Sequence, residues 1–151
     1  MFRLALEKLA QMIVAGVTHN YGLDALPNTL HRGQMPVLLV MPVDFDSGQR
    51  LFRDRGSGFE SVTFSGGSRT VNYLVTHLLL IAPVSTGVGL QTHLPLLVDV
   101  MEAYFEALGA QVTLEGLLLE PARVRLEPGE FDYGGVRYIG CAFKHSWVVA
   151  V

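Results

Sequence analysis

Residues 70–83 read TVNYLVTHLLLIAP, a run of β-branched, aromatic and leucine residues that ends at Pro83. This composition predicts a strand, and alternate residues of a strand point to opposite faces of its sheet. One face carries Val71, Tyr73, Val75, His77, Leu79 and Ile81, and the other carries Asn72, Leu74, Thr76, Leu78 and Leu80. Because large apolar side chains occur on both faces, each face of this strand needs a cover.

Two β-rich runs lie upstream of this strand. Residues 59–64 are joined to it by Ser65-Gly66-Gly67-Ser68. Since glycine accepts the positive φ of tight hairpin turns, the two arms predict a hairpin. Residues 35–41 form an apolar run flanked by Pro36 and Pro42, which predicts a short buried strand.

Two segments show the helical period. Apolar residues at steps of three and four predict an amphipathic helix over residues 2–15 and a second one over about 94–108. The predicted buried stripe is Phe2, Leu6, Leu9 and Ile13 in the first helix, and Leu94, Leu97, Val98, Met101, Phe105 and Leu108 in the second. Gly16 and Gly109 are expected to end them.

The last third of the chain predicts two more strands. Residues 123–127 alternate between charged and apolar side chains, and Pro128-Gly129 is expected to break that strand. After a turn at Tyr133-Gly134-Gly135, a final strand runs over about 136–149. Helices and strands do not alternate strictly. We therefore expect a single α+β domain over residues 1–151, with a mostly antiparallel sheet and two α-helices packed on one face.

A long polar segment, VDFDSGQRLFRDRGSG, occupies residues 43–58. It contains Arg50, Arg53 and Arg55 together with three aspartates. The arginines could bind phosphate, but the aspartates cancel most of their field, which argues against nonspecific nucleic-acid binding. We expect the segment to form charged pairs across an interface with a neighbouring subunit. A loop that only faces solvent is the alternative.

The composition is apolar for a chain of this length. Of the 151 residues 17% are charged, the net charge is −3, and the mean hydropathy is +0.35. An average domain has about 25% charged residues, so the deficit indicates surface reserved for partners, which we expect to be copies of the same chain. The negative balance argues against a basic nucleic-acid-binding domain. The apolar run at residues 78–84 is too short to span a membrane.

The sequence does not predict catalysis, a metal site or a cofactor. No pair among the five histidines has the spacing of a known metal site, although His77 and His145 could be neighbours in the sheet. Cys141 and His145 lie four apart on a predicted strand, about 13 Å along it, so they cannot form a nucleophile–base pair. Cys141 is expected to be a small core residue. An enzyme is therefore the last of the functional alternatives.

In the order of its elements, the chain resembles the tail terminator, or tail completion, proteins of long-tailed bacteriophages. The likeness covers an N-terminal amphipathic helix, the segments MPVLLVMP and THLLLIAP, the helix LPLLVDVMEAYFEAL, and the closing pair RVRLEPGEFDYGGVRYIGCAFKHSWVVAV. A late turn, here Tyr133-Gly134-Gly135, leads into a long final strand in that family. The resemblance extends over nearly the whole chain and contains no motif with fixed chemistry.

The resemblance implies a virion protein that is assembled in the host cytoplasm. It implies a six-membered ring at the head-proximal end of the tail, which contacts the tail tube protein and the neck connector or head-closure protein. DNA would pass through the channel without specific binding. No catalytic residue, metal or cofactor belongs to the family. The alternatives are a head-closure or connector ring of the neck, and a small non-viral ligand-binding domain with its site between the helices and the sheet.

The candidate assembly contacts come from the two features that need partners, the polar segment 43–58 and the strand at residues 70–83. They are Arg50, Arg53, Arg55, Leu78 and Leu79. Helices on one face leave the other face of the sheet open, so we expect either Leu78 or Leu79 to lie on an uncovered surface. A ring that uses two different patches of each subunit would cover it.

Overall fold

The computed structural model describes residues 1–42, 58–65, 68–85 and 89–150. Its two α-helices are α1 (Phe2–Gln11) and α2 (Leu94–Gly109), and short 3-10 helices lie at Leu23–Ala25, Arg32–Gln34 and Leu90–Thr92. Its strands are β1 (His19–Tyr21), β2 (Val37–Met41), β3 (Gly58–Ser65), β4 (Ser68–Pro83), β5 (Arg123–Tyr133) and β6 (Val136–Ala150). The order of elements matches the α+β organisation expected from the sequence, with the short strand β1 added.

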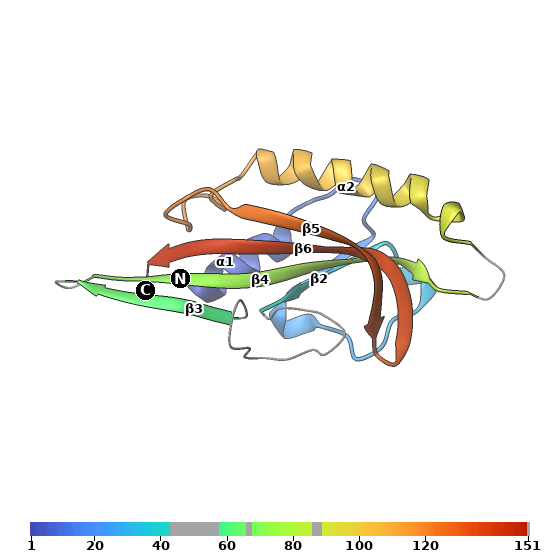
Figure 1. The fold of residues 1–151 in the computed structure, drawn as a ribbon, viewed down its shortest axis with the longest axis horizontal. Helices are drawn as coiled ribbons and strands as arrows, with labels where there is room; N and C mark the ends of the chain where they lie inside the picture. Colours follow the sequence, from blue (N-terminus) through green and yellow to red (C-terminus); the bar gives the residue numbers. More distant parts are fainter. Residues whose placement is uncertain (43–57, 66–67, 86–88, 151) are drawn as a thin grey trace.

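The sheet is built around β4 (Figure 1). Its strand order is β1-β2-β4-β6-β5, and β3 pairs with β4 beside this path. The first half of β4 pairs with β3 and the second half with β2, so these two strands follow one another along the same edge. Its other edge pairs with β6 from Thr70–Ala150 to Pro83–Tyr138. All pairs are antiparallel except β1 with β2.

Both helices cover the same face of the sheet. The core on that face joins side chains of both helices to the odd-numbered residues of β4 and β6, among them Val75, Leu79, Cys141 and Phe143. Figure 1 shows α2 running alongside β5 and β6, with α1 lying behind the sheet. The predicted arrangement of two helices on one face of a mostly antiparallel sheet is confirmed.

The helix α1 is shorter than predicted. It ends at Gln11, and Met12 takes an extended conformation with ψ 127°. In extended chain alternate residues point in opposite directions. Met12 and Val14 are therefore buried, while Ile13, which was expected in the buried stripe, is 90% exposed.

The buried stripe of α2 is also displaced from the predicted one. Leu97, Val100, Tyr104 and Leu108 are buried, whereas Leu94, Val98 and Phe105 are exposed. The helix carries two apolar stripes side by side, so periodicity alone could not decide between them. The stripe that includes Tyr104 faces the sheet because the sheet offers partners to its hydroxyl, as described below.

The opposite face of the sheet is covered by the same chain, contrary to expectation. Leu78 and Leu80 there pack with Val37, Leu39 and Tyr138. Over them lie apolar residues of the irregular segment between β1 and β2, namely Leu26, Leu30 and Met35, and Phe131 of β5. Both Leu78 and Leu79 are 0% exposed. The expectation that one of them would be uncovered is therefore wrong.

The hairpin of β5 and β6 helps to hold this second cover in place. It bends strongly in Figure 1, and its end carries Tyr133, which donates a hydrogen bond to the Pro27 carbonyl. At the turn, Gly134 has a φ of 57°, and a Cβ on it would lie 2.6 Å from the Asn28 carbonyl oxygen. A Cβ on Gly140 would lie 1.8 Å from the Leu79 carbonyl oxygen. Both close approaches require glycine.

Pro128-Gly129 does not break β5 as the sequence suggested. The strand continues through both residues to Tyr133, and Gly129 pairs with Gly140 of β6. The position of the strand explains this, because β5 is the last strand on its side of the sheet order. On an edge strand the missing N–H of a proline can point away from the neighbouring strand.

Candidate functional site

The sheet brings His77 and His145 together on the helix-covered face. His77 lies on β4 and His145 on β6, their ring centroids are 6.4 Å apart, and both side chains are fully buried. Tyr104 of α2 lies between them. Its hydroxyl is 2.8 Å from Nδ1 of His77 and 2.6 Å from Nε2 of His145. The predicted proximity of the two histidines is confirmed, and the tyrosine that joins them was not predicted.

The hydrogen-bonded chain continues at both ends. Nε2 of His77 is 2.8 Å from Oδ1 of Asn20, whose amide nitrogen donates to the carbonyls of Leu9 and Met12, each at 3.1 Å. At the other end, the indole N–H of Trp147 donates to Nδ1 of His145 at 3.2 Å. We call these five side chains, Asn20, His77, Tyr104, His145 and Trp147, the buried polar chain.

The direction of every bond in the buried polar chain follows from its two ends. The Trp147 indole nitrogen can only donate, so Nδ1 of His145 accepts and its proton lies on Nε2. The N–H at Nε2 of His145 donates to the hydroxyl oxygen of Tyr104, and the Tyr104 hydroxyl donates to Nδ1 of His77. The N–H of His77 at Nε2 then donates to Oδ1 of Asn20. All members are neutral, and both nitrogens of each imidazole have a partner.

Burial keeps these groups neutral. It lowers the pKa of His145 to about 3. Burial, together with the nearby His145, lowers the pKa of His77 well below its ordinary value. Burial also raises the pKa of Tyr104 well above its ordinary value, with a smaller contribution from Cys141. A charge at any of these positions would have to be desolvated without a counter-ion.

This arrangement supports a structural role for the buried polar chain. Among the described residues no three His, Cys, Asp or Glu side chains gather into a group that could hold a metal ion. The two imidazoles have no ring nitrogen left for a ligand. Instead, the hydrogen bonds of the buried polar chain connect α2, β4, β6, β1 and the end of α1. They therefore fix the orientation of the helices on the sheet.

Cys141 is a core residue, as predicted. It is fully buried beside Ile139 and Phe143 on the helix-covered face. Burial raises the pKa of its thiol to about 12, so the thiol stays protonated and is a poor nucleophile.

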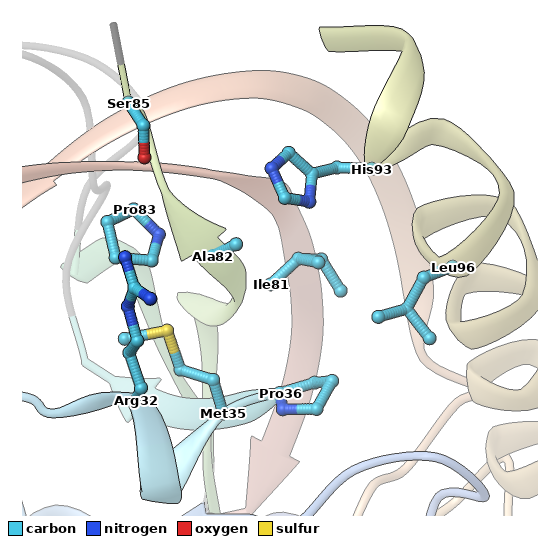
Figure 2. Close-up of a pocket in the computed structure, with 9 residues that line it drawn as sticks. All are labelled: Arg32, Met35, Pro36, Ile81, Ala82, Pro83, Ser85, His93 and Leu96. Atoms are coloured by element: carbon cyan, nitrogen blue, oxygen red, sulfur yellow. The ribbon is translucent and has the colours of Figure 1, made fainter. Parts of the chain in front are cut away.

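A pocket of about 390 Å³ lies at the N-terminal end of α2 (Figure 2). Its apolar lining comes from the segment before β2, the end of β4 and the helix, and consists of Met35, Pro36, Ile81, Ala82, Pro83 and Leu96. Arg32, Ser85 and His93 add polar groups. Figure 2 shows His93 and Leu96 projecting from the helix side across the pocket from Arg32 and Met35.

The outer side of α2 carries an exposed apolar flank next to a row of carboxylates. Val98 is 58% exposed and Phe105 is 47% exposed, and Leu94 continues their line. Asp99 and Glu106 are exposed beside them, as is Glu102. The helix contains no lysine or arginine. An apolar flank bordered by charges of one sign is typical of a surface that meets a partner.

Of the residues expected to make assembly contacts, the structure describes only Leu78 and Leu79. Arg50, Arg53 and Arg55 lie outside the described residues, as does most of the polar segment 43–58. Leu78 and Leu79 are inside the subunit, on opposite faces of the sheet. Val98 and Phe105 were expected in the core and are at the surface instead.

The sequence held a partial signal for the buried polar chain. A histidine at the centre of the apolar run 70–83 and a tyrosine in the otherwise apolar–acidic helix 94–109 both need buried partners. Nothing in the sequence indicated Asn20, because it belongs to the segment between the first helix and the strand at residues 37–41.

No protein-family model matches the chain, and no curated protein matches it. Neither described helix combines the length and the apolarity that crossing a bilayer requires.

Proposed function

We propose that this protein is a structural subunit of a long-tailed bacteriophage, forming a ring that caps the head-proximal end of the tail tube. The ring, with six subunits as its expected size, joins the tube to the neck connector. Its sites would be subunit interfaces, with no catalytic centre and no cofactor. The sequence resemblance supplies the identity of the assembly, and the structure supports the part that concerns association.

The observation that carries the proposal is the exposed flank of α2. Leu94, Val98 and Phe105 form a line of large apolar side chains on a helix that is already anchored by another stripe. Exposed apolar side chains of this kind promote aggregation of a monomer, whereas in an assembly they are buried against a neighbouring subunit. The polar side chains of the buried polar chain, on the helix-covered face, hydrogen-bond to one another. This favours a structural role for them over a catalytic one.

Three measurements test the proposed function. Sedimentation velocity of the purified protein should give a closed oligomer, and negative-stain electron microscopy should show rings. Adding the protein to growing tail tubes should stop their elongation, because a terminator covers the growing end. A protein that remains monomeric, or that leaves tube growth unchanged, would contradict the proposal. A ring that instead plugs DNA-filled heads would identify the head-closure alternative.

The pocket beside α2 favours a second candidate, a small ligand-binding domain. Its size lies at the lower end of the range of about 300–1,000 Å³ that small-molecule sites occupy. That candidate predicts a stable monomer that binds a small apolar ligand, so the same sedimentation experiment separates it from the ring.

A further inference from the structure

The helix α2 presents different surfaces on its two sides. Each residue of an α-helix advances by about 100°, so Leu96 and Phe105 point in roughly opposite directions. Leu96 faces the pocket at the N-terminal end of the helix. Phe105 belongs to the exposed flank with Leu94 and Val98. One side of α2 is thus part of a hollow, while the other bears apolar side chains that are about half exposed, among them Phe105, whose ring also packs edge-on against the buried Phe143.

The charges on these two sides are opposite and unpaired. Every carboxylate side chain that the structure describes outside α2 forms an ion pair. Asp99, Glu102 and Glu106 of α2 form none with any described residue. Arg32, at the pocket, is likewise without an ion pair in the described part of the chain. The subunit therefore carries anions beside its flank and a cation at its pocket, and neither has an ion-pair partner among the residues that the structure describes.

The chemistry of the flank matches that of the pocket. Glu102 and Phe105 are three residues apart, which makes them neighbours on the helix surface. The pocket offers an apolar lining of proline, isoleucine and leucine with the guanidinium of Arg32 beside it (Figure 2). The ring of Phe105 could enter such a pocket while the carboxylate of Glu102 forms an ion pair with the guanidinium of Arg32.

We propose that the exposed flank of α2 in one subunit docks into the pocket of a second copy of this chain, with Phe105 in the pocket and Glu102 against Arg32. This inference rests on the proposed ring and names its interface. Because the two patches differ and lie on opposite sides of α2, the contact is heterologous. Repeating it turns each subunit by the same angle and can close into a ring.

The first test removes the apolar part of the contact. Phe105→Ser should shift the protein from ring to folded monomer in sedimentation velocity, with an unchanged circular dichroism spectrum. Ile13→Ser is the matched control, since Ile13 is a more exposed apolar residue that belongs to neither patch. Val98→Ser serves in place of Phe105→Ser if that variant does not fold. A ring that survives both flank substitutions would overturn the interface.

The second test asks whether the two patches meet each other. Glu102→Arg and Arg32→Glu should each weaken assembly by about 30-fold or more, because each places like charges together. The double variant should assemble again, within about threefold of the wild type. A double variant no better than the weaker single variant would overturn the pairing.

The outcomes separate this inference from the function on which it rests. If the wild-type protein is monomeric, the ring and the interface both fail. If the wild type forms a ring that ignores Phe105, Val98, Glu102 and Arg32 substitutions, only the interface fails and the ring stands. Binding of a small apolar ligand to the pocket of an intact ring would also exclude the pocket as the interface.

Discussion

The two faces of the sheet are covered in different ways. The face with Leu79 is covered by two helices and contains the buried polar chain of Asn20, His77, Tyr104, His145 and Trp147. The face with Leu78 is covered by the segment between β1 and β2, and the cluster at its centre is formed by apolar side chains such as Val37, Leu39 and Leu80. A helix can slide or rotate on an apolar surface, whereas directional hydrogen bonds fix one orientation. The segment between β1 and β2 is held instead by contacts to its backbone. The Tyr133 hydroxyl donates to the Pro27 carbonyl, and Gly134 lies close to the Asn28 carbonyl oxygen.

The strongest test asks whether both faces are closed within one subunit. Leu78→Asp and Leu79→Asp should each unfold the protein, because each buries an unpaired charge on a different face. Circular dichroism and gel filtration of the two variants measure this. Val136→Asp, at an exposed position of β6, is the control that should stay folded. A folded, soluble Leu78→Asp protein would show that the irregular cover opens easily.

A smaller effect should distinguish the two stripes of α2. Tyr104→Ala should lower the free energy of unfolding by about 3–5 kcal/mol, because it empties a fully buried site and leaves two imidazoles without a partner. Phe105→Ala, at the next residue, should lower it by about 1 kcal/mol, since that side chain is half exposed in the isolated subunit. Urea unfolding of the monomeric protein measures both. Equal losses would mean that the stripe with Phe105 is core after all.

The buried polar chain also predicts a dependence on pH that the other face does not share. His77 and His145 bind protons in the unfolded protein below about pH 6.5 but resist protonation when folded, so acid favours unfolding. The free energy of unfolding should be highest above that pH and fall as the pH drops, by about 1.4 kcal/mol per pH unit from His145, whose pKa in the folded protein is about 3, with a further loss of the same sign from His77. By pH 5 the loss from His145 should reach about 2 kcal/mol.

Urea unfolding over a series of pH values measures this dependence. His145→Gln keeps a hydrogen-bonding side chain and removes one titrating group, so it should lower the slope by about 1.4 kcal/mol per pH unit. If the slope is the same with and without His145, that imidazole does not resist protonation in the folded protein, and the assigned bond directions are wrong.

Much of the fold could be predicted from local patterns. The alternation in residues 70–83, the glycine turns and the two helical periods were sufficient for the α+β class, the hairpins and every described strand except β1. Local patterns could not identify the buried side of a helix that has two apolar stripes of equal periodicity. In α2, the stripes through Tyr104 and Phe105 are both apolar, and only the position of His77 and His145 in three dimensions decides between them.

The sequence was least informative about irregular chain. The segment between β1 and β2 contains Leu26, Leu30 and Met35 without any period, so its role as a cover for Leu78 was not foreseen. The same holds for Asn20, whose side chain closes the buried polar chain. For the candidate surface, the composition predicted that an apolar surface for partners exists but not where it lies. The exposed apolar flank is on α2 and not on β4.

The central position of β4 has a consequence for how the protein folds. Its hairpin with β3 and the hairpin of β5 with β6 are local and can form early. Joining them requires pairs such as Val75 with His145, which bring together residues about 70 positions apart and close a large loop before most of the core exists. We therefore expect slow refolding, on the scale of milliseconds to seconds, with β4–β6 pairing as the late step. Until that step the strand at residues 70–83 has apolar residues uncovered on both faces, and this is the stage at which crowding or high concentration would divert the chain into aggregates.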